Sequence, residues 1–219
     1  MTLPVLYIIQ NNHFWLSPQR CVFWEEEQAL ILSDLHFGKT GHFRKHGIAV
    51  PQTVFQEDMQ RLVEQIAYFK PKQIIAVGDL FHSRANKEMD LFIKWRNDFS
   101  KIDFILVRGN HDILDMGWYE KTGIQVKEGK YNIGGFSFLH DPAENEMDNS
   151  SENFIFSGHL HPGVHISGLG KQGLSFPCFH FTNHQAILPA FSKFSGFVIM
   201  RRKKTHTVFA IVDDKIIRL

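Results

Sequence analysis

Five short apolar runs of strand length are each followed within three residues by aspartate, asparagine or histidine, and this repetition constrains the fold more than any other feature. Asp34-Leu35-His36 follows the run 29–33, Gly78-Asp79 the run 73–77, and residues 109–112 the run 104–107. His140 and Asp141 follow the run 136–139, and residues 158–161 follow the run 154–157. In open α/β sheets, ligand sites lie just beyond the carboxyl ends of the strands. We therefore expect these five loops to meet at one rim.

The segments between these runs predict helices in the first half of the chain. Apolar side chains recur at spacings of four and three between the first two runs: Phe55, Met59, Leu62, Ile66 and Phe69. This stripe predicts one helix that ends near Pro71, and Leu91, Ile93 and Trp95 suggest a second. The second half is mainly strands, with further runs at 197–200 and 208–212, joined by turn residues. We expect an α/β fold in which two sheets pack face to face with helices outside, as a single domain over residues 1–219.

Composition excludes several classes of protein. The 219 residues are 43% hydrophobic and 21% charged, which is typical of soluble globular chains. A formal net charge of +1 gives no whole-molecule attraction to nucleic acid or membrane, so any such attraction must be local. Two cysteines without metal-type spacing fit a reducing cytosol, and we expect a cytoplasmic protein. The amino terminus lacks a basic region before its apolar run, and no run reaches the roughly 20 residues of a membrane span, so no membrane association is expected.

The polar residues after the runs form a donor set suited to metal ions. The set holds four histidines, two aspartates and one asparagine: Asp34, His36, Asp79, Asn110, His140, His159 and His161. Imidazole and carboxylate without thiolate suit manganese, iron or zinc. Seven donors exceed one tetrahedral ion and fit two ions that share a carboxylate. We expect Asp34 and His36 to point the same way along an extended segment, as do His159 and His161, so that each pair presents two ligands to a common cluster. Neighbouring glycines should allow tight turns.

Taken together, these motifs resemble those of the calcineurin-like metallophosphoesterases over residues 34–161. The resemblance implies a four-layer αββα sandwich with two divalent ions, manganese being favoured over iron or zinc. It places Asp34, His36, Asp79 and His161 on one ion, and Asp79, Asn110, His140 and His159 on the other. Asp79 would bridge the ions, and His111 would be a catalytic histidine that binds no metal and faces the substrate.

A narrower resemblance covers most of the chain. Residues 34–39, 42–47, 78–84 and 188–196 are similar to those of a bacterial phosphodiesterase family encoded beside a DNA ligase, a helicase and an exonuclease. It implies a role in DNA repair, with DNA or RNA as substrate and the ligase and helicase as partners. The Gly-Asp-x-x-Asp-Arg motif of the protein phosphatases is absent, because His82 and Ser83 stand in its last two positions. What orients His111 is left open between a backbone carbonyl and Asp112.

Several residues near the first motif are candidates for substrate binding. Lys39, His42, Arg44, Lys45 and His46 form a basic segment around Phe43, which could bind flanking phosphates and stack on a base. The alternative is a solvated loop whose Phe43 packs in the core. His82 either supports the metal ligands or contacts substrate. The run 201–204 is read as a charged hairpin turn that could also touch nucleic acid. The remaining histidines are read as ordinary surface or structural residues: His13, His165, His180, His184 and His206.

The chemistry expected of such a site is hydrolysis of a phosphoester. A hydroxide bridging the two ions attacks phosphorus in line, and His111 stabilises or protonates the leaving oxygen. We expect a phosphodiesterase, with a pyrophosphatase or phosphomonoesterase on a small nucleotide-type substrate as the alternative. A metal-free protein-binding scaffold is a third possibility, disfavoured because every ligand position holds a competent residue.

Overall fold

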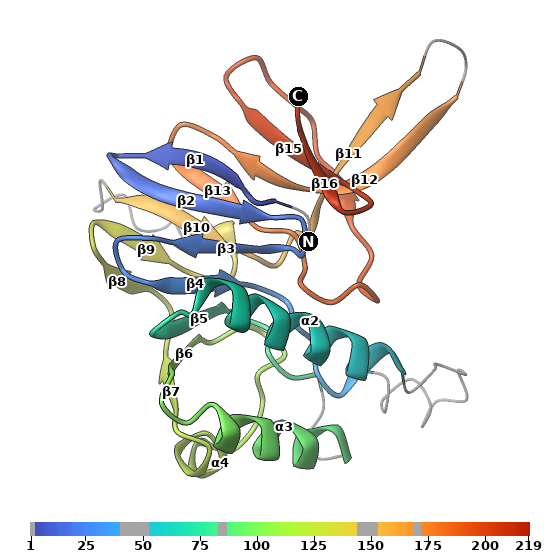
Figure 1. The fold of residues 1–219 in the computed structure, drawn as a ribbon. Coiled ribbons are helices and arrows are strands. Elements are labelled where there is room, and N and C mark those ends of the chain that lie inside the picture. Colours follow the sequence, from blue (N-terminus) through green and yellow to red (C-terminus); the bar gives the residue numbers. More distant parts are fainter. Residues whose placement is uncertain (1–2, 40–52, 83–86, 144–152, 169–171) are drawn as a thin grey trace.

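A computed structural model describes residues 3–39, 53–82, 87–143, 153–168 and 172–219. It contains two sheets packed face to face (Figure 1). The described chain contains no helix long and apolar enough to cross a membrane. Two mixed sheets with helices on an outer face confirm the predicted fold class.

The first sheet has seven strands in sequence order. They are β1 (Val5–Ile9), β2 (Asn12–Ser17), β3 (Cys21–Trp24), β4 (Ala29–Leu32), β5 (Gln73–Val77), β6 (Asp103–Val107) and β7 (Ile124–Lys127). Strands β1 to β4 pair antiparallel, and β4 to β7 pair parallel. The parallel strands β4, β5 and β6 are almost wholly buried, as expected for strands covered on both faces. Their carboxyl ends therefore lie side by side at one rim.

The second sheet is mixed and is built from the second half of the chain. Its order is β14-β11-β12-β13-β10-β9-β8, and β15 pairs with both β12 and β16. The strands are β8 (Tyr131–Ile133), β9 (Phe136–Phe138), β10 (Phe154–Ser157), β11 (Pro162–Ser167), β12 (Gly173–Phe181), β13 (Gln185–Ile187), β14 (Val198–Ile199), β15 (Thr207–Val212) and β16 (Lys215–Arg218). Strands β9, β10 and β13 run parallel, so the ends of β9 and β10 also share one edge.

Helices cover the outer face of the first sheet, and those within the described ranges are α2 (Thr53–Phe69), α3 (Lys87–Asp98) and α4 (Met116–Lys121). The predicted stripe on α2 faces this sheet, with Phe55, Leu62 and Ile66 buried. The second predicted helix is present, but Leu91 is 45% exposed whereas Phe92 is fully buried. The helix turns Met89, Phe92 and Trp95 inward because residues three apart share a face.

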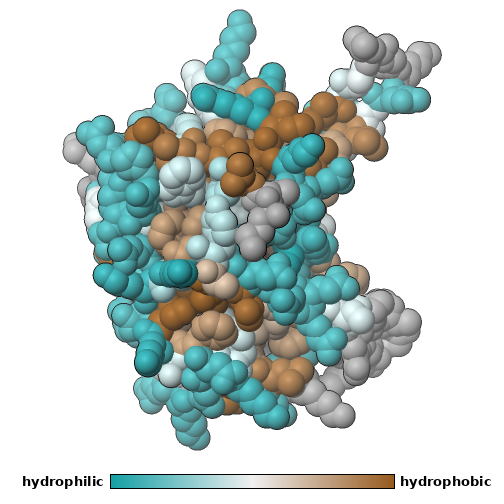
Figure 2. Space-filling view, in the orientation of Figure 1, coloured by the Kyte–Doolittle hydropathy of each residue, from teal (hydrophilic) through white to brown (hydrophobic). Residues whose placement is uncertain are grey.

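The space between the sheets is filled mainly by aromatic side chains. Phe14 stacks on Trp24, both meet Phe136 edge to face, and Phe156 packs at a tilt against Phe14. The outer face of the second sheet carries a smaller apolar cluster around Cys178, which none of the described helices covers. Figure 2 shows hydrophobic surface gathered over β15, β16 and the base of β11 and β12.

Candidate metal centre

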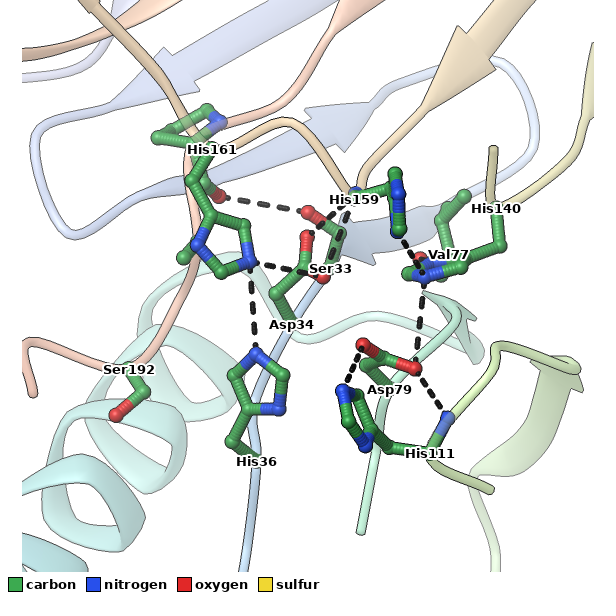
Figure 3. Close-up of polar contacts among 12 residues, drawn as sticks. Ser33, Asp34, His36, Val77, Asp79, His111, His140, His159, His161 and Ser192 are labelled. Atoms are coloured by element: carbon green, nitrogen blue, oxygen red, sulfur yellow. Dashed lines mark hydrogen bonds and ion pairs between the residues drawn. The ribbon is translucent and has the colours of Figure 1, made fainter. Parts of the chain in front are cut away.

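The loops after five strands bring their polar residues together at one rim, as the sequence predicted (Figure 3). Asp34 and His36 follow β4, Asp79 follows β5, His111 follows β6, and His140 follows β9. The loop after β10 carries His159 and His161. The rim thus joins both sheets.

The backbone of this rim is not extended. Five residues adopt a left-handed conformation: Asp34 (φ 55°), His36 (φ 50°), Asp79 (φ 51°), His159 (φ 65°) and His161 (φ 45°). Asp34 and His36 do share one donor group, as expected, but the extended segment predicted between them is wrong, because the chain leaves strand geometry after β4 ends at Leu32. Positive φ is uncommon for residues other than glycine and gathers at functional sites, where the surrounding structure holds it in place.

Three glycines at the rim leave room for site side chains. A Cβ atom on Gly78 would lie 2.0 Å from His140 Nδ1, and one on Gly109 would lie 2.4 Å from both the backbone nitrogen and Oδ1 of Asp79. A Cβ on Gly158 would lie 2.6 Å from Asp34 Oδ2. Of the three, only Gly78 has a positive φ. The main function of these glycines is therefore close approach between loops rather than the tight turns that we expected.

Two groups of donors each have ligand atoms within 4.8 Å of one another. The first is Asp34, His36 and His161, and the second is Asp34, Asp79 and His140. In the first group, His161 Nε2 lies 3.2 Å from Asp34 Oδ1 and 3.5 Å from His36 Nε2. Asp34 is fully buried, and its carboxylate also accepts the backbone N–H of His159.

The second group surrounds Asp79, which is also buried. His140 Nε2 lies 3.4 Å from Asp79 Oδ1, and His159 Nδ1 lies 3.2 Å from His140 Nε2. The His159 ring also lies near Asp141, with 3.9 Å between Nε2 and Oδ2. His159 and His161 therefore reach different groups from the same loop.

In two histidines the ring nitrogen that points away from the carboxylates is hydrogen-bonded to a backbone carbonyl, which leaves the other ring nitrogen able to coordinate a cation. The Nδ1 atom of His140 faces the Val77 carbonyl at 3.2 Å, and that of His161 faces the Gly196 carbonyl at 3.1 Å. A carbonyl only accepts, so each Nδ1 carries the proton, and in the neutral ring each Nε2 presents a lone pair. Those lone pairs face the oxygens of Asp79 and Asp34. The Nε2 lone pairs and the buried carboxylate oxygens are all acceptors, so a cation bound between them would stabilise the arrangement. Metal-ligating histidines commonly donate their other ring N–H to a backbone carbonyl, as His140 and His161 do.

The electrostatics of the protein without metal agree with this fit. Burial lowers the pKa of His140, but its hydrogen bond to Asp79 and the negative charge of that residue outweigh burial and raise the pKa to about 9. Burial raises the pKa of Asp79, but His140 and the backbone N–H of His111 outweigh burial and hold the pKa well below its usual range. Burial lowers the pKa of His36 to about 3, so this ring stays neutral and available as a ligand. Without a metal, a proton on His140 compensates the Asp79 carboxylate.

His111 and His82 lie together beside the second group. The His111 backbone N–H donates to Asp79 Oδ1 at 2.9 Å, while its side chain is 49% exposed with Nε2 3.9 Å from Asp79 Oδ2. The His82 ring lies 4.3 Å from the His111 ring, measured between centroids. Asn110, in the same loop as His111, is exposed. His82 thus flanks the predicted catalytic histidine.

Asp112 braces the loops through both of its carboxylate oxygens. They accept the backbone N–H groups of Phe81 and Gly109, at 3.1 and 2.9 Å. Burial raises the pKa of Asp112 to about 7. This carboxyl therefore ties the loop after β5 to the loop after β6, which fixes the backbone of both Asp79 and His111.

The predicted substrate-binding residues are only partly described. Lys39 is half-buried at the edge of the first group, where burial lowers its pKa although the charges of Asp34 and Asp79 oppose the shift. Arg44 and the rest of the basic segment, residues 42–46, lie outside the described residues. The remaining histidines have structural contacts; for example, buried His180 faces His206 with 2.8 Å between ring nitrogens.

The segment 188–196 contributes to the site in a way that its sequence did not predict. The Gly196 carbonyl faces His161, and the Ser192 backbone N–H donates to the Asp34 carbonyl at 3.3 Å. The only signal in the sequence was the resemblance of this segment to the repair-associated phosphodiesterases. A cavity of about 800 Å³ lies elsewhere, lined by residues that include Ser17, Gln65 and Tyr68, and it contains none of the predicted site residues.

Comparisons with known proteins identify similar folds and one family. The chain is similar in structure to a nuclease, MPE, from Pseudomonas putida, with a TM-score of 0.83 and 23% sequence identity over 99% of this chain and 100% of the other. A second similar structure is Yfce, a phosphoesterase from E. coli, at 13% identity and a TM-score of 0.48, covering 87% and 97% of the two chains. No curated protein matches the sequence significantly.

The family model for calcineurin-like phosphoesterases matches residues 28–188, a span that begins just before β4 and ends just after β13. This span includes both donor groups and His111. The chain therefore belongs to the calcineurin-like phosphoesterase family and is a metal-dependent phosphoester hydrolase.

Proposed function

We propose that this enzyme is a dinuclear phosphodiesterase that cleaves nucleic acid. The observation that supports this most is the pair of adjacent donor groups around Asp34 and Asp79, with the exposed His111 side chain beside them. Divalent ions held there would polarise the phosphoryl oxygens and lower the pKa of water for in-line attack. Manganese is the ion that we propose, with iron or zinc as alternatives.

The ligand sets follow the expectation from sequence, with Asp79 as the shared carboxylate. His36 and His161 would join Asp34 on one ion, and His140, His159 and Asn110 would hold the other. Asp34 belongs to both donor groups by distance, so this carboxylate is the rival for the bridging role. Replacing each carboxylate separately distinguishes the two assignments.

His111 is the residue that we propose to act on the leaving group. Its backbone is fixed by Asp79 and by the loop that Asp112 braces, whereas its ring is half exposed toward the rim. A protonated imidazole at this position donates a proton to the leaving oxygen as the bond to phosphorus breaks. His82, whose ring centre lies 4.3 Å away, would hold the His111 ring in place or contact the substrate.

A phosphodiester in DNA or RNA is the substrate that we favour. The similar structure from Pseudomonas putida is that of a nuclease, and the flanking motifs resemble those of repair-associated phosphodiesterases. We propose DNA repair in the cytoplasm as the setting, with a DNA ligase and a helicase as partners. Lys39, whose charge interacts with those of Asp34 and Asp79, is the residue that we propose to bind a phosphate beside the scissile one.

The test is hydrolysis by protein reconstituted separately with manganese, iron or zinc. We expect faster turnover of bis(p-nitrophenyl) phosphate than of p-nitrophenyl phosphate, and cleavage of oligonucleotides. Preference for the monoester, or for a nucleotide-sugar pyrophosphate, would replace the diesterase proposal with one of its alternatives. Protein that binds no metal and hydrolyses none of these substrates would favour the scaffold.

A further inference from the structure

The distribution of charge along the chain is strongly uneven. Residues 153–212 contain six of the 24 lysines and arginines but none of the 23 aspartates and glutamates. This acid-free stretch forms β10 to β15, which make up most of the second sheet. The near-neutral total therefore conceals one basic region, which adjoins the metal centre through the loop that holds His159 and His161.

Within this stretch, the segment 188–196 is fixed to the first sheet. Ala190 bridges to Ser33, and the Phe191 backbone N–H donates to the Ser33 carbonyl at 2.8 Å. The guanidinium of Arg61, on α2, lies 4.4 Å from the centre of the Phe191 ring. Arg20 donates to the carbonyls of residues 190 and 192. Figure 1 shows this segment passing beside α2.

The same segment leads directly out of the metal centre. The Gly196 carbonyl faces His161 Nδ1, and the Val198 backbone N–H donates to the His161 carbonyl at 2.9 Å. Val198 and Ile199 then pair with Pro162 and Gly163 in the second sheet. The chain after Gly196 is thus held in register with a metal ligand.

An exposed aromatic ring lies on this path. The Phe197 ring packs on Gly163, where a Cβ would lie 2.2 Å from its Cδ2 atom, yet 38% of Phe197 remains exposed. Phe194, just before it, is 40% exposed. Two partly exposed aromatic rings beside the metal centre present flat apolar faces on which a base can stack.

Cations follow the aromatic residues. Arg201, Arg202, Lys203 and Lys204 are all exposed, and none of them forms an ion pair with a described residue. The chain from Gly196 to Lys204 spans at most about 29 Å when fully extended. The four cations therefore follow the aromatic residues along one path that leads out of the metal centre.

We propose that residues 193–204, the basic aromatic strip, bind a single strand of nucleic acid and guide it into the metal centre. This inference rests on the proposed phosphodiesterase function. Exposed rings stack on bases and nearby cations bind the backbone phosphates, which is the combination that single-strand binding proteins use. A duplex fits this surface poorly, because its bases are already stacked on one another and present no free face to Phe197.

The test separates strand binding from chemistry. The variant R201Q/R202Q/K203Q/K204Q removes the charges, and Phe197→Leu removes the ring while keeping an apolar side chain against Gly163. The matched control K70Q/K94Q/K101Q/K121Q removes four exposed cations elsewhere. Binding of fluorescein-labelled oligothymidylate is followed by anisotropy in manganese-loaded protein that also carries His111→Ala, and turnover of bis(p-nitrophenyl) phosphate is measured with His111 present.

We expect the strip variant to bind the oligonucleotide more weakly, with the slope of log K against log salt concentration reduced by about 0.7 for each phosphate that the strip no longer neutralises. Phe197→Leu should weaken binding roughly 5- to 150-fold, the equivalent of removing one stacked base. The control should bind as the wild type does, and all three should hydrolyse the small diester at the wild-type rate.

Unchanged oligonucleotide binding by the strip variant, in a protein that hydrolyses the small diester, would overturn this inference and leave the proposed function standing. Equal or tighter binding of a duplex of the same length would overturn the assignment to a single strand. A wild type that hydrolyses no diester would instead overturn the proposed function.

Discussion

Gly109 offers a sharp test of how the centre is built. The residue follows β6, and its φ is not in the positive range, so alanine is sterically acceptable to the backbone itself. The obstacle is the neighbouring loop, because the new Cβ would lie 2.4 Å from the Asp79 backbone nitrogen and from Asp79 Oδ1. Ordinary contact needs at least 3.4 Å, so the two loops must separate by about 1 Å. Asp79 would carry that displacement into the metal centre.

The expected magnitude follows from this displacement. Metal–ligand distances tolerate about 0.2 Å, and a 1 Å misplacement costs on the order of 100-fold in rate. Overpacking of this kind typically lowers the free energy of unfolding by about 1 to 3 kcal/mol, which is roughly 2 to 12 °C in Tm for a chain of this size. We therefore expect Gly109→Ala to bind less metal. Its turnover should fall by far more than the modest loss in the free energy of unfolding would cause by itself.

The assay combines metal content by mass spectrometry, thermal unfolding and turnover of bis(p-nitrophenyl) phosphate. Gly168→Ala is the matched control, because among the described residues its Cβ would meet only the Gln172 carbonyl oxygen, at 3.7 Å, and it should change none of the three. Gly158→Ala should resemble Gly109→Ala, since its Cβ would lie 2.6 Å from Asp34 Oδ2. Full metal content and normal activity in Gly109→Ala would refute the reasoning.

Three further outcomes are expected. His111→Ala should keep both metals but slow turnover roughly 100- to 10,000-fold, with a smaller effect for good leaving groups, and metal loss on equilibrium dialysis would make His111 a ligand instead. Asp79→Asn should weaken both metal sites in a titration, whereas Asp34→Asn should weaken one; the reverse pattern would make Asp34 the bridge. Cys21 and Cys178 are buried, and burial raises the pKa of each thiol to about 12, so neither should react with a thiol reagent at about pH 8 until the chain unfolds. Rapid labelling of the native protein would contradict that burial.

Much of the rim was predictable because it depends on local sequence. A buried parallel strand is a short apolar run, and the residue after it must lie at the sheet edge, so Asp34, Asp79 and His140 could be placed without a structure. The helix over residues 53–69 could be predicted equally well, because a helix that buries one face needs apolar residues at spacings of three and four. Strands β1 to β3 were missed, since their residues are recognised as strands only through the partners beside them.

The sequence by itself determined which chemical groups the centre has and the order in which the strands deliver them. Only the tertiary structure decided how those groups face one another: the left-handed backbone at Asp34 and Asp79, and the space that Gly109 leaves for Asp79. It also joined Gly196 to His161, two residues that lie far apart in the chain. Such contacts depend on how one loop packs against another that is distant in sequence. The residues of a single loop do not determine which other loop will pack against it.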